Sequence, residues 1–586
     1  MLKNMDAWIK RALTILIGGI VFYLTLLSAF STSAGEERNF AAAGERDIAY
    51  YNFYLSDSVL LHIAVLFIFI FAVTAVVRKF NSRKNHVLSK MEWVNCFIFF
   101  IVGMLWIFLT RMHPISDQQK VLSIAEQMSL GDFSQFRVNE GYLWRYPDQM
   151  GIVFFYYLHV TLFGKYAYLS IQVSNLLAAT TALLVVKRLS DLIFSAESDK
   201  KIGIEVQLAY MLFVPYLLYI TFIYGTILGF SFSLLAMYYE VKFLQQGKIK
   251  YVFLSALFIS FAVAFKTNSL IMMVAMLLFL IYDILMEYKK KESLFFLIMI
   301  LLAQFLFTQG IQLFMSSRSG YEVSKGMPKA NWVAMALQES RYAPGTWNGY
   351  SVHLYEDANY VYEDANRLAI NSIKKSLNAF MEDKSEAVRW LGKKMAAQWN
   401  EPYFGAIEIS RNREGAENIP KAVESIIYGR AGYIILSYLN FLQTIILFGC
   451  FMYFMLSKCK NIKRESLLLG VAMLGGFAFH IFWEGKNQYV LPYFLLLIPY
   501  SVKGYQILVY RINYLLDRFK VGFCPSGKDV ILIISCITLT ITLTIGLYPT
   551  RLFQYMIAVK DEPELCMLYE KTVEENIIES ERNHNE

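Results

Sequence analysis

The sequence predicts an all-α polytopic membrane protein with about thirteen transmembrane helices and a mostly helical extracytoplasmic domain. Of its 586 residues, 56% are hydrophobic and only 17% are charged, which excludes a single water-soluble core. Apolar runs of about 18 to 25 residues recur along the chain, and each can cross a hydrocarbon core of about 30 Å as a helix. A single long polar segment, residues 316–428, interrupts these runs.

The predicted spans are the apolar runs found with a window of about 19 residues. They cover residues 12–30, 57–77, 93–111, 166–187, 204–222, 225–243, 249–265, 268–287, 294–315, 430–456, 465–483, 488–509 and 529–549. A fourteenth run, 152–163, is short for a span and follows a polar loop. We therefore expect it to form a re-entrant or juxtamembrane helix.

Basic residues orient these spans, because cytoplasmic loops carry an excess of Lys and Arg. Four basic groups mark the cytoplasmic side, and they lie within residues 78–90, 187–201, 289–291 and 458–464. The outer face is then expected to hold the loop 112–150, the turn at Lys266, the turn 483–489 and the segment 316–428. The net charge of +8 is therefore attributed to topology rather than to nucleic-acid binding.

The chain divides into five predicted parts. These are an N-terminal transmembrane hairpin with a cytoplasmic loop (1–90), a transmembrane core with its first outer loop (91–315, loop 112–150), an extracytoplasmic soluble domain (316–428), C-terminal transmembrane helices (429–550) and a polar tail (551–586). Apolar residues spaced by three and four predict helices over 361–380 and 385–399 in the soluble domain.

Cysteine usage points to packing rather than to chemistry. The six cysteines form no CxxC pair and mostly fall in or beside apolar runs, where a free cysteine behaves as a small hydrophobe. Neither a disulfide framework nor a metal site is indicated, and a divalent metal stays an open possibility. The expected cofactor is therefore unknown.

Asp117 is the first candidate for chemistry. Ser116 is a plausible N-cap, and Val121, Ile124 and Met128 share one face of the helix that follows, which predicts an amphipathic helix lying on the membrane surface. Asp117 would then lie in its first turn, where the helix dipole keeps a carboxylate ionised and suited to act as a general base. The alternative is that Asp117 only caps the helix.

Two further polar turns are expected on the same side. Lys266 lies between two apolar helices with no acidic neighbour in sequence, which indicates either a phosphate-binding cation or a side chain that snorkels to the interface. Residues 480–493 hold Glu484, Lys486 and Tyr489 between two apolar runs. These residues are either part of a site, or an ion pair with an aromatic belt at the interface.

Taken together, these turns resemble the GT-C superfamily of integral-membrane glycosyltransferases, which includes protein O-mannosyltransferases and lipid A aminoarabinose transferases. The resemblance covers roughly residues 92–510. It rests on Asp117 in the first outer loop, on Tyr146-Pro147 with Gln149 and Gly151 before an apolar segment, on Lys266, and on the spacing of Glu484, Tyr489 and Pro492. The chain departs from the family where Gln118 follows the acid and where Gln488 replaces a common Arg.

The resemblance implies a polyprenyl-phosphate sugar donor, a glycan, lipid or protein acceptor, and a site on the extracytoplasmic face of the cell membrane. The resemblance implies that Asp117 is the catalytic base. It also implies that Lys266 binds the donor phosphate, with Lys486 and Arg145 as weaker candidates. The site would also be lined by a set of polar and aromatic residues. These are Tyr146, Gln149, Asn268, Glu484 and Tyr489.

Two other classes stay open. A polysaccharide polymerase or ligase also combines many spans with a large outer loop, and Arg411 and Arg413 would suit it. A transporter of lipid-linked sugars is less favoured, because matched broken helices in two halves are expected there. Tyr224-Gly225 and Leu228-Gly229 break one region, and the second half shows no counterpart.

Overall fold

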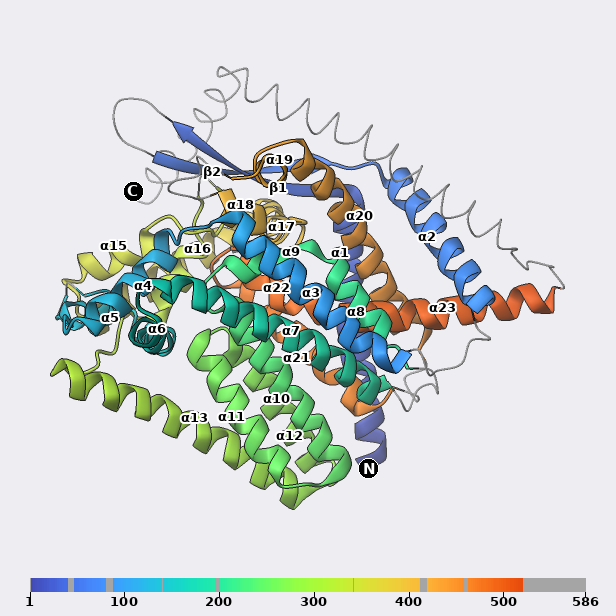
Figure 1. Cartoon of the computed structure of the whole chain (residues 1–586), viewed down its shortest axis with the longest axis horizontal. Helices are drawn as coiled ribbons and strands as arrows, with labels where there is room; N and C mark the ends of the chain where they lie inside the picture. Colours follow the sequence, from blue (N-terminus) through green and yellow to red (C-terminus); the bar gives the residue numbers. More distant parts are fainter. Residues whose placement is uncertain are drawn as a thin grey trace.

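The described residues of the chain form a bundle of helices with one two-stranded sheet (Figure 1). A computed structural model describes residues 2–40, 47–80, 88–139, 141–194, 201–340, 342–411, 419–457 and 462–519. The elements of the first part are α1 (Leu2–Phe30), β1 (Ser31–Phe40), β2 (Asp47–Ser56), α2 (Val59–Phe80), α3 (Leu88–Thr110), α4 (Ser116–Ser129), α5 (Tyr142–Arg145), α6 (Met150–Phe163), α7 (Ala167–Phe194), α8 (Gly203–Leu212), α9 (Val214–Leu218), α10 (Thr226–Gln246), α11 (Lys250–Phe265), α12 (Ser269–Leu285) and α13 (Lys290–Ser319).

A polar segment and a last group of helices follow. The remaining elements are α14 (Lys329–Met335), α15 (Tyr350–Asp357), α16 (Tyr362–Glu382), α17 (Lys384–Trp399), α18 (Ala406–Arg411), α19 (Lys421–Ile427), α20 (Arg430–Leu456), α21 (Leu468–Ile481), α22 (Asn487–Leu495) and α23 (Ile498–Arg518). We refer to residues 321–429, which contain the helices α14 to α19, as the α14–α19 segment. The helices predicted over 361–380 and 385–399 are confirmed as α16 and α17.

The structure confirms a multi-pass membrane protein. Within the described ranges, eight helices are long and apolar enough to cross a membrane. They are Asn4–Phe30, Val59–Arg78, Lys90–Thr110, Pro147–Phe194, Thr226–Gln246, Lys290–Ser319, Arg430–Leu456 and Arg464–Ile481. A ninth is obtained if α8 and the helix Val214–Thr221, bent by 71° relative to each other, count as one span.

The count of about thirteen spans is not confirmed, for reasons that differ between runs. Runs 249–265 and 268–287 form α11 and α12, whose 16 and 17 residues fall below the length of the other spans. Run 204–222 is broken at Phe213, before Pro215, and run 488–509 is divided between α22 and α23. Run 529–549 and the polar tail lie outside the described residues.

Two groups of helices build the bundle. In Figure 1, α10, α11, α12 and α13 lie together at the lower left, whereas α1, α20 and α23 lie at the right. The helix α7 contacts α10 and α23, and α21 contacts α12 and α1, so these two helices join the groups. The paired strands, from Ser31↔Ser56 to Phe40↔Asp47, were not predicted, and they contact α17.

The first loop departs from prediction at two points. The helix α4 begins at Ser116, and Ile115 occupies the cap position without a side-chain cap, so Ser116 is not the N-cap. The predicted apolar face, which includes Val121 and Ile124, is buried. However, this face packs against α6, so protein rather than lipid covers it.

Candidate functional site

The Lys266 turn is held by glycines at the start of α10. A Cβ atom on Gly225, whose φ is 77°, would lie 2.0 Å from the carbonyl oxygen of Phe265. One on Gly229 would lie 2.8 Å from Cβ of Lys266. Only glycine permits this close approach, because it has no Cβ and adopts positive φ without strain. The Tyr224-Gly225 and Leu228-Gly229 pairs therefore allow α10 to pass directly against the turn.

Lys266 is enclosed by aromatic rings rather than by carboxylates. Its Nζ donates to the carbonyl oxygen of Tyr224 at 3.3 Å, and it lies 4.1 Å from the centre of the Tyr224 ring and 5.3 Å from that of Tyr489. Burial lowers the pKa of Lys266 to about 7, and the charge of Lys486 acts in the same direction. In the described part of the chain no carboxylate forms an ion pair with this ammonium group, which leaves it available to an anion.

Asp117 lies exposed in the first turn of α4, as predicted. The neighbouring Gln118 is buried, and its Oε1 accepts a hydrogen bond from the backbone N–H of Ile223 at 2.9 Å. This bond fixes the start of α4 to the chain segment that carries Tyr224. Burial raises the pKa of Tyr224, and the negative charge of Asp117 raises it further. Gln118, which departs from the family pattern, thus has a structural use here.

Glu484 also contacts Tyr489. The Tyr489 hydroxyl donates to Glu484 Oε2 at 3.4 Å, and the Lys486 ammonium lies 5.9 Å from the centre of the Tyr489 ring. Burial raises the pKa of Glu484; Asp117 adds to this effect, whereas Lys486 and Lys266 oppose it. Four ionisable residues from three turns distant in sequence therefore influence one another's pKa near Tyr489. They are Asp117, Lys266, Glu484 and Lys486.

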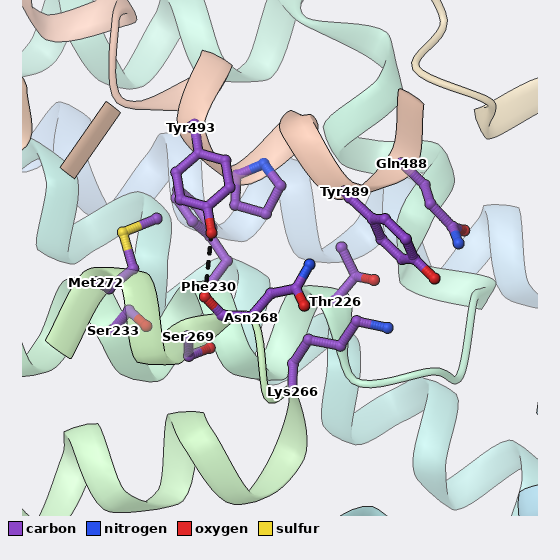
Figure 2. A pocket seen from close by; sticks show the side chains of 11 residues that line it. Thr226, Phe230, Ser233, Lys266, Asn268, Ser269, Met272, Gln488, Tyr489 and Tyr493 are labelled. Atoms are coloured by element: carbon purple, nitrogen blue, oxygen red, sulfur yellow. Dashed lines mark hydrogen bonds between the residues drawn. The ribbon is translucent and has the colours of Figure 1, made fainter. Parts of the chain in front are cut away.

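A pocket opens beside Lys266 (Figure 2). It lies between α10, the start of α12 and α22. The lining residues are Thr226, Phe230, Ser233, Lys266, Asn268, Ser269, Met272, Gln488, Tyr489, Pro492 and Tyr493. The Tyr493 hydroxyl donates to the carbonyl oxygen of Asn268 at 3.1 Å, which joins α22 to the Lys266 turn. The predicted residues Asn268 and Tyr489 thus form part of its wall.

Two predicted residues, Arg145 and Tyr146, contact the α14–α19 segment instead. Arg145 is 3.6 Å from Glu356 and stacks on Tyr360, with its guanidinium carbon 5.3 Å from the ring centre. Tyr146 packs edge-on against Trp332 at 5.8 Å. Gln149 is half-buried at the end of a short 3-10 turn before α6. Arg145 is therefore engaged by the α14–α19 segment rather than gathered around Tyr489.

The α14–α19 segment also holds the loop that carries Glu484. The buried Lys394 on α17 donates to the carbonyl oxygens of Ala336 at 2.7 Å and Ile481 at 3.0 Å. The backbone N–H of Gly485 donates to the carbonyl oxygen of Gly345 at 2.7 Å. Burial lowers the pKa of Lys394 to about 7. These contacts fix the 481–485 loop from outside the bundle.

A second buried ionisable side chain, that of Glu401, positions the start of α22. Glu401 accepts from the backbone N–H groups of Tyr403 and Gly405, at 3.0 and 2.6 Å, and from Asn487 Nδ2 at 3.0 Å. Burial raises the pKa of Glu401 to about 8, and the hydrogen bonds oppose this shift. Asn487 is the first residue of α22, so Glu401 anchors the turn that presents Tyr489.

Sequence reasoning did not select Tyr142, Asp148, Thr226 or Ser233 as site residues. The Tyr142 and Tyr224 hydroxyls lie 3.4 Å apart, and Asp148 accepts from Thr267 at 3.5 Å while pairing with Lys329 at 3.3 Å. Only the residues of α10 had a signal in the sequence, because the glycines at its start had marked a break between apolar runs. Arg413, raised for the polymerase alternative, lies outside the described residues.

Comparisons with known proteins show only a distant likeness. No family model matches the chain, and no curated protein matches it. One similar solved structure is an archaeal oligosaccharyltransferase AglB from Archaeoglobus fulgidus in complex with an inhibitory peptide and a dolichol-phosphate. It shares 12% identity and a TM-score of 0.32, over 74% of this chain and 54% of that one. The chain thus spans about half the length of that protein, and a likeness this low says nothing about activity.

Proposed function

We propose that this protein is a membrane glycosyltransferase that moves a sugar from a polyprenyl-phosphate-linked donor to a glycan, lipid or protein acceptor on the outer face. The observation that carries the proposal is that three turns distant in sequence meet at Tyr224 and Tyr489. Gln118, the residue after Asp117, binds the backbone of Ile223. Lys266 Nζ lies against the Tyr224 and Tyr489 rings, and Glu484 accepts from the Tyr489 hydroxyl. Transfer from a phosphate-linked sugar requires an acid, a cation that can bind the phosphate, and an adjacent pocket for the sugar.

In the proposed reaction, the acceptor hydroxyl attacks the anomeric carbon of the donor sugar. Asp117 takes the hydroxyl proton as the new carbon–oxygen bond forms. The bond between the anomeric carbon and the phosphate oxygen breaks, and its electron pair leaves with the phosphate. Lys266 stabilises the charge that develops on that phosphate, an interaction strengthened by the low dielectric around the Tyr224 and Tyr489 rings.

The outer location is supported by where the basic loops lie. The helix α12 starts beside Lys266 and ends at Leu285, and the basic run Lys289 to Lys291 follows its far end. The helix α3 starts near Lys90 and ends before the loop that carries Asp117. Because basic loops favour the cytoplasmic side, the ends of these helices that carry the site are assigned to the outer face.

Replacing Asp117 with asparagine tests the proposal. General-base catalysis contributes about 10²- to 10⁴-fold, so Asp117→Asn should lower sugar transfer by at least about 100-fold. Transfer is measured in membranes supplied with a panel of radiolabelled polyprenyl-phosphate hexoses, at matched amounts of protein. Glu126→Gln, on the exposed face of the same helix, is the control and should transfer normally. Near-normal transfer by Asp117→Asn would exclude it as the base.

A further inference from the structure

The pocket beside Lys266 has polar atoms that the protein leaves unsatisfied. Thr226 Oγ1, Ser233 Oγ and Asn268 Nδ2 are buried and have no hydrogen-bond partner among the described residues, and all three residues line the pocket. A buried polar group without a partner is costly, and native structures keep few of them. Three on one pocket wall indicate that a ligand supplies their partners.

The three atoms are spread along the pocket rather than gathered at one point. Thr226 and Ser233 are seven residues apart on one face of α10, which corresponds to about 10 Å along a helix. Figure 2 shows Thr226 and Asn268 beside Lys266, and Ser233 further along, near Met272. A ligand that satisfies all three must therefore extend from the Lys266 end of the pocket toward Met272.

Apolar and aromatic side chains separate these polar atoms, and Lys266, Ser269 and Gln488 add further polar groups to the wall. Phe230, Met272, Pro492 and Tyr493 line the pocket between the polar atoms. A pyranose ring matches this mixture, because its C–H faces pack on apolar and aromatic side chains while its hydroxyls both donate and accept hydrogen bonds.

Other occupants match less well. An isoprenoid chain has no group that could satisfy the polar atoms. A phosphate has only acceptor oxygens when ionised, and it is compact, so one bound at Lys266 would not reach Ser233.

We propose that this pocket receives the monosaccharide unit of the donor, and that Thr226, Asn268 and Ser233 hydrogen-bond to its hydroxyls. Lys266 then lies at the end of the pocket where the phosphate joins the sugar. The inference rests on the proposed function and adds to it the residues that recognise the sugar. Thr226 and Ser233 are specificity-determining residues in this assignment, and they act on binding of the sugar rather than on the transfer of the proton.

The test compares two kinds of lipid of equal charge, without and with a sugar, for binding to the full chain in nanodiscs. One is a polyprenyl methyl phosphate, which has no sugar; the others are polyprenyl phosphates that carry glucose, mannose, galactose or N-acetylglucosamine. At least one glycosyl lipid should bind more tightly than the methyl ester. Ser233→Ala and Thr226→Val, which keep size and remove a hydroxyl, should each weaken binding of that lipid by roughly 3- to 10-fold. Binding of the methyl ester should not change.

The matched control is Ser231→Ala, since Ser231 is equally buried on α10 but does not line the pocket. It should leave both affinities unchanged. If the methyl ester binds as tightly as every glycosyl lipid, or if Ser233→Ala and Thr226→Val weaken both kinds of lipid alike, the pocket holds only water or lipid and the inference is overturned. If no lipid phosphate binds at all, the proposed function fails instead, which separates the two outcomes.

Discussion

Replacing Lys266 with methionine removes the cation beside the pocket while keeping a long, flexible apolar side chain. In the protein as it stands, this ammonium contacts one carbonyl and two aromatic rings and has no carboxylate partner in the described residues. Its hydrogen bond to a phosphate would therefore be a new charge-assisted bond, worth about 1.5–3 kcal/mol. Lys266→Met is expected to weaken binding of polyprenyl methyl phosphate by about 10- to 150-fold.

The pH dependence of lipid-phosphate binding tests the role of Lys266 in a second, independent way. The pKa of Lys266 is about 7 in the free protein, so the amine is charged below pH 7 and loses its proton as the pH rises. A phosphodiester keeps one negative charge over this range, and its binding favours the charged amine. Affinity should therefore be level below pH 7 and fall by up to about tenfold per pH unit above it. Lys266→Met should show no such fall.

Binding to the full chain in nanodiscs, measured by calorimetry between pH 6 and pH 9, checks both statements. Lys486→Met is the matched control: Lys486 lies 5.9 Å from the centre of the Tyr489 ring and is not part of the pocket wall, so a smaller effect is expected. Equal affinities for the wild type and Lys266→Met, or the same pH dependence in both, would refute the role given to this residue.

Two further predictions concern the supports of the site. Gly225→Ala should destabilise the protein by more than about 3 kcal/mol, because it combines a positive φ with a Cβ atom 2.0 Å from a backbone oxygen. The control is Gly247→Ala, at φ 69° with no atom within 4 Å of the added Cβ, which should cost only about 1 kcal/mol. Thermal unfolding measures both variants. Lys394→Met leaves two buried carbonyls without their donor and should lower the melting temperature at pH 7. The folded pKa of Lys394 is depressed to about 7, so unfolding takes up a proton between pH 7 and the unfolded pKa of about 10.5, and this residue makes stability rise with pH in that window. Lys394→Met should show a smaller rise in stability with pH. An equal rise in both proteins would contradict the lowered pKa assigned to the buried Lys394 amine.

Local features were predictable wherever the signal lies in neighbouring residues. The amphipathic spacing of Val121, Ile124 and Met128 predicted α4, and the polar turn at Lys266 was recognised because it interrupts two apolar runs. The spans were less predictable, since hydropathy averages over a window and does not detect the bend at Phe213 or the break between α22 and α23. Tertiary packing decides such breaks.

The amino-acid sequence by itself determined that the chain is a helical multi-pass membrane protein with an acid, a cation and a second acid in separate polar turns, because run length, periodicity and charge are local properties. Tertiary structure alone decided which residues surround them. Thr226 and Ser233 have no motif, and they line the pocket because Gly225 and Gly229 let α10 approach the Lys266 turn. Lys394 lies on an amphipathic helix and is buried only because α17 packs against the loop that carries Glu484.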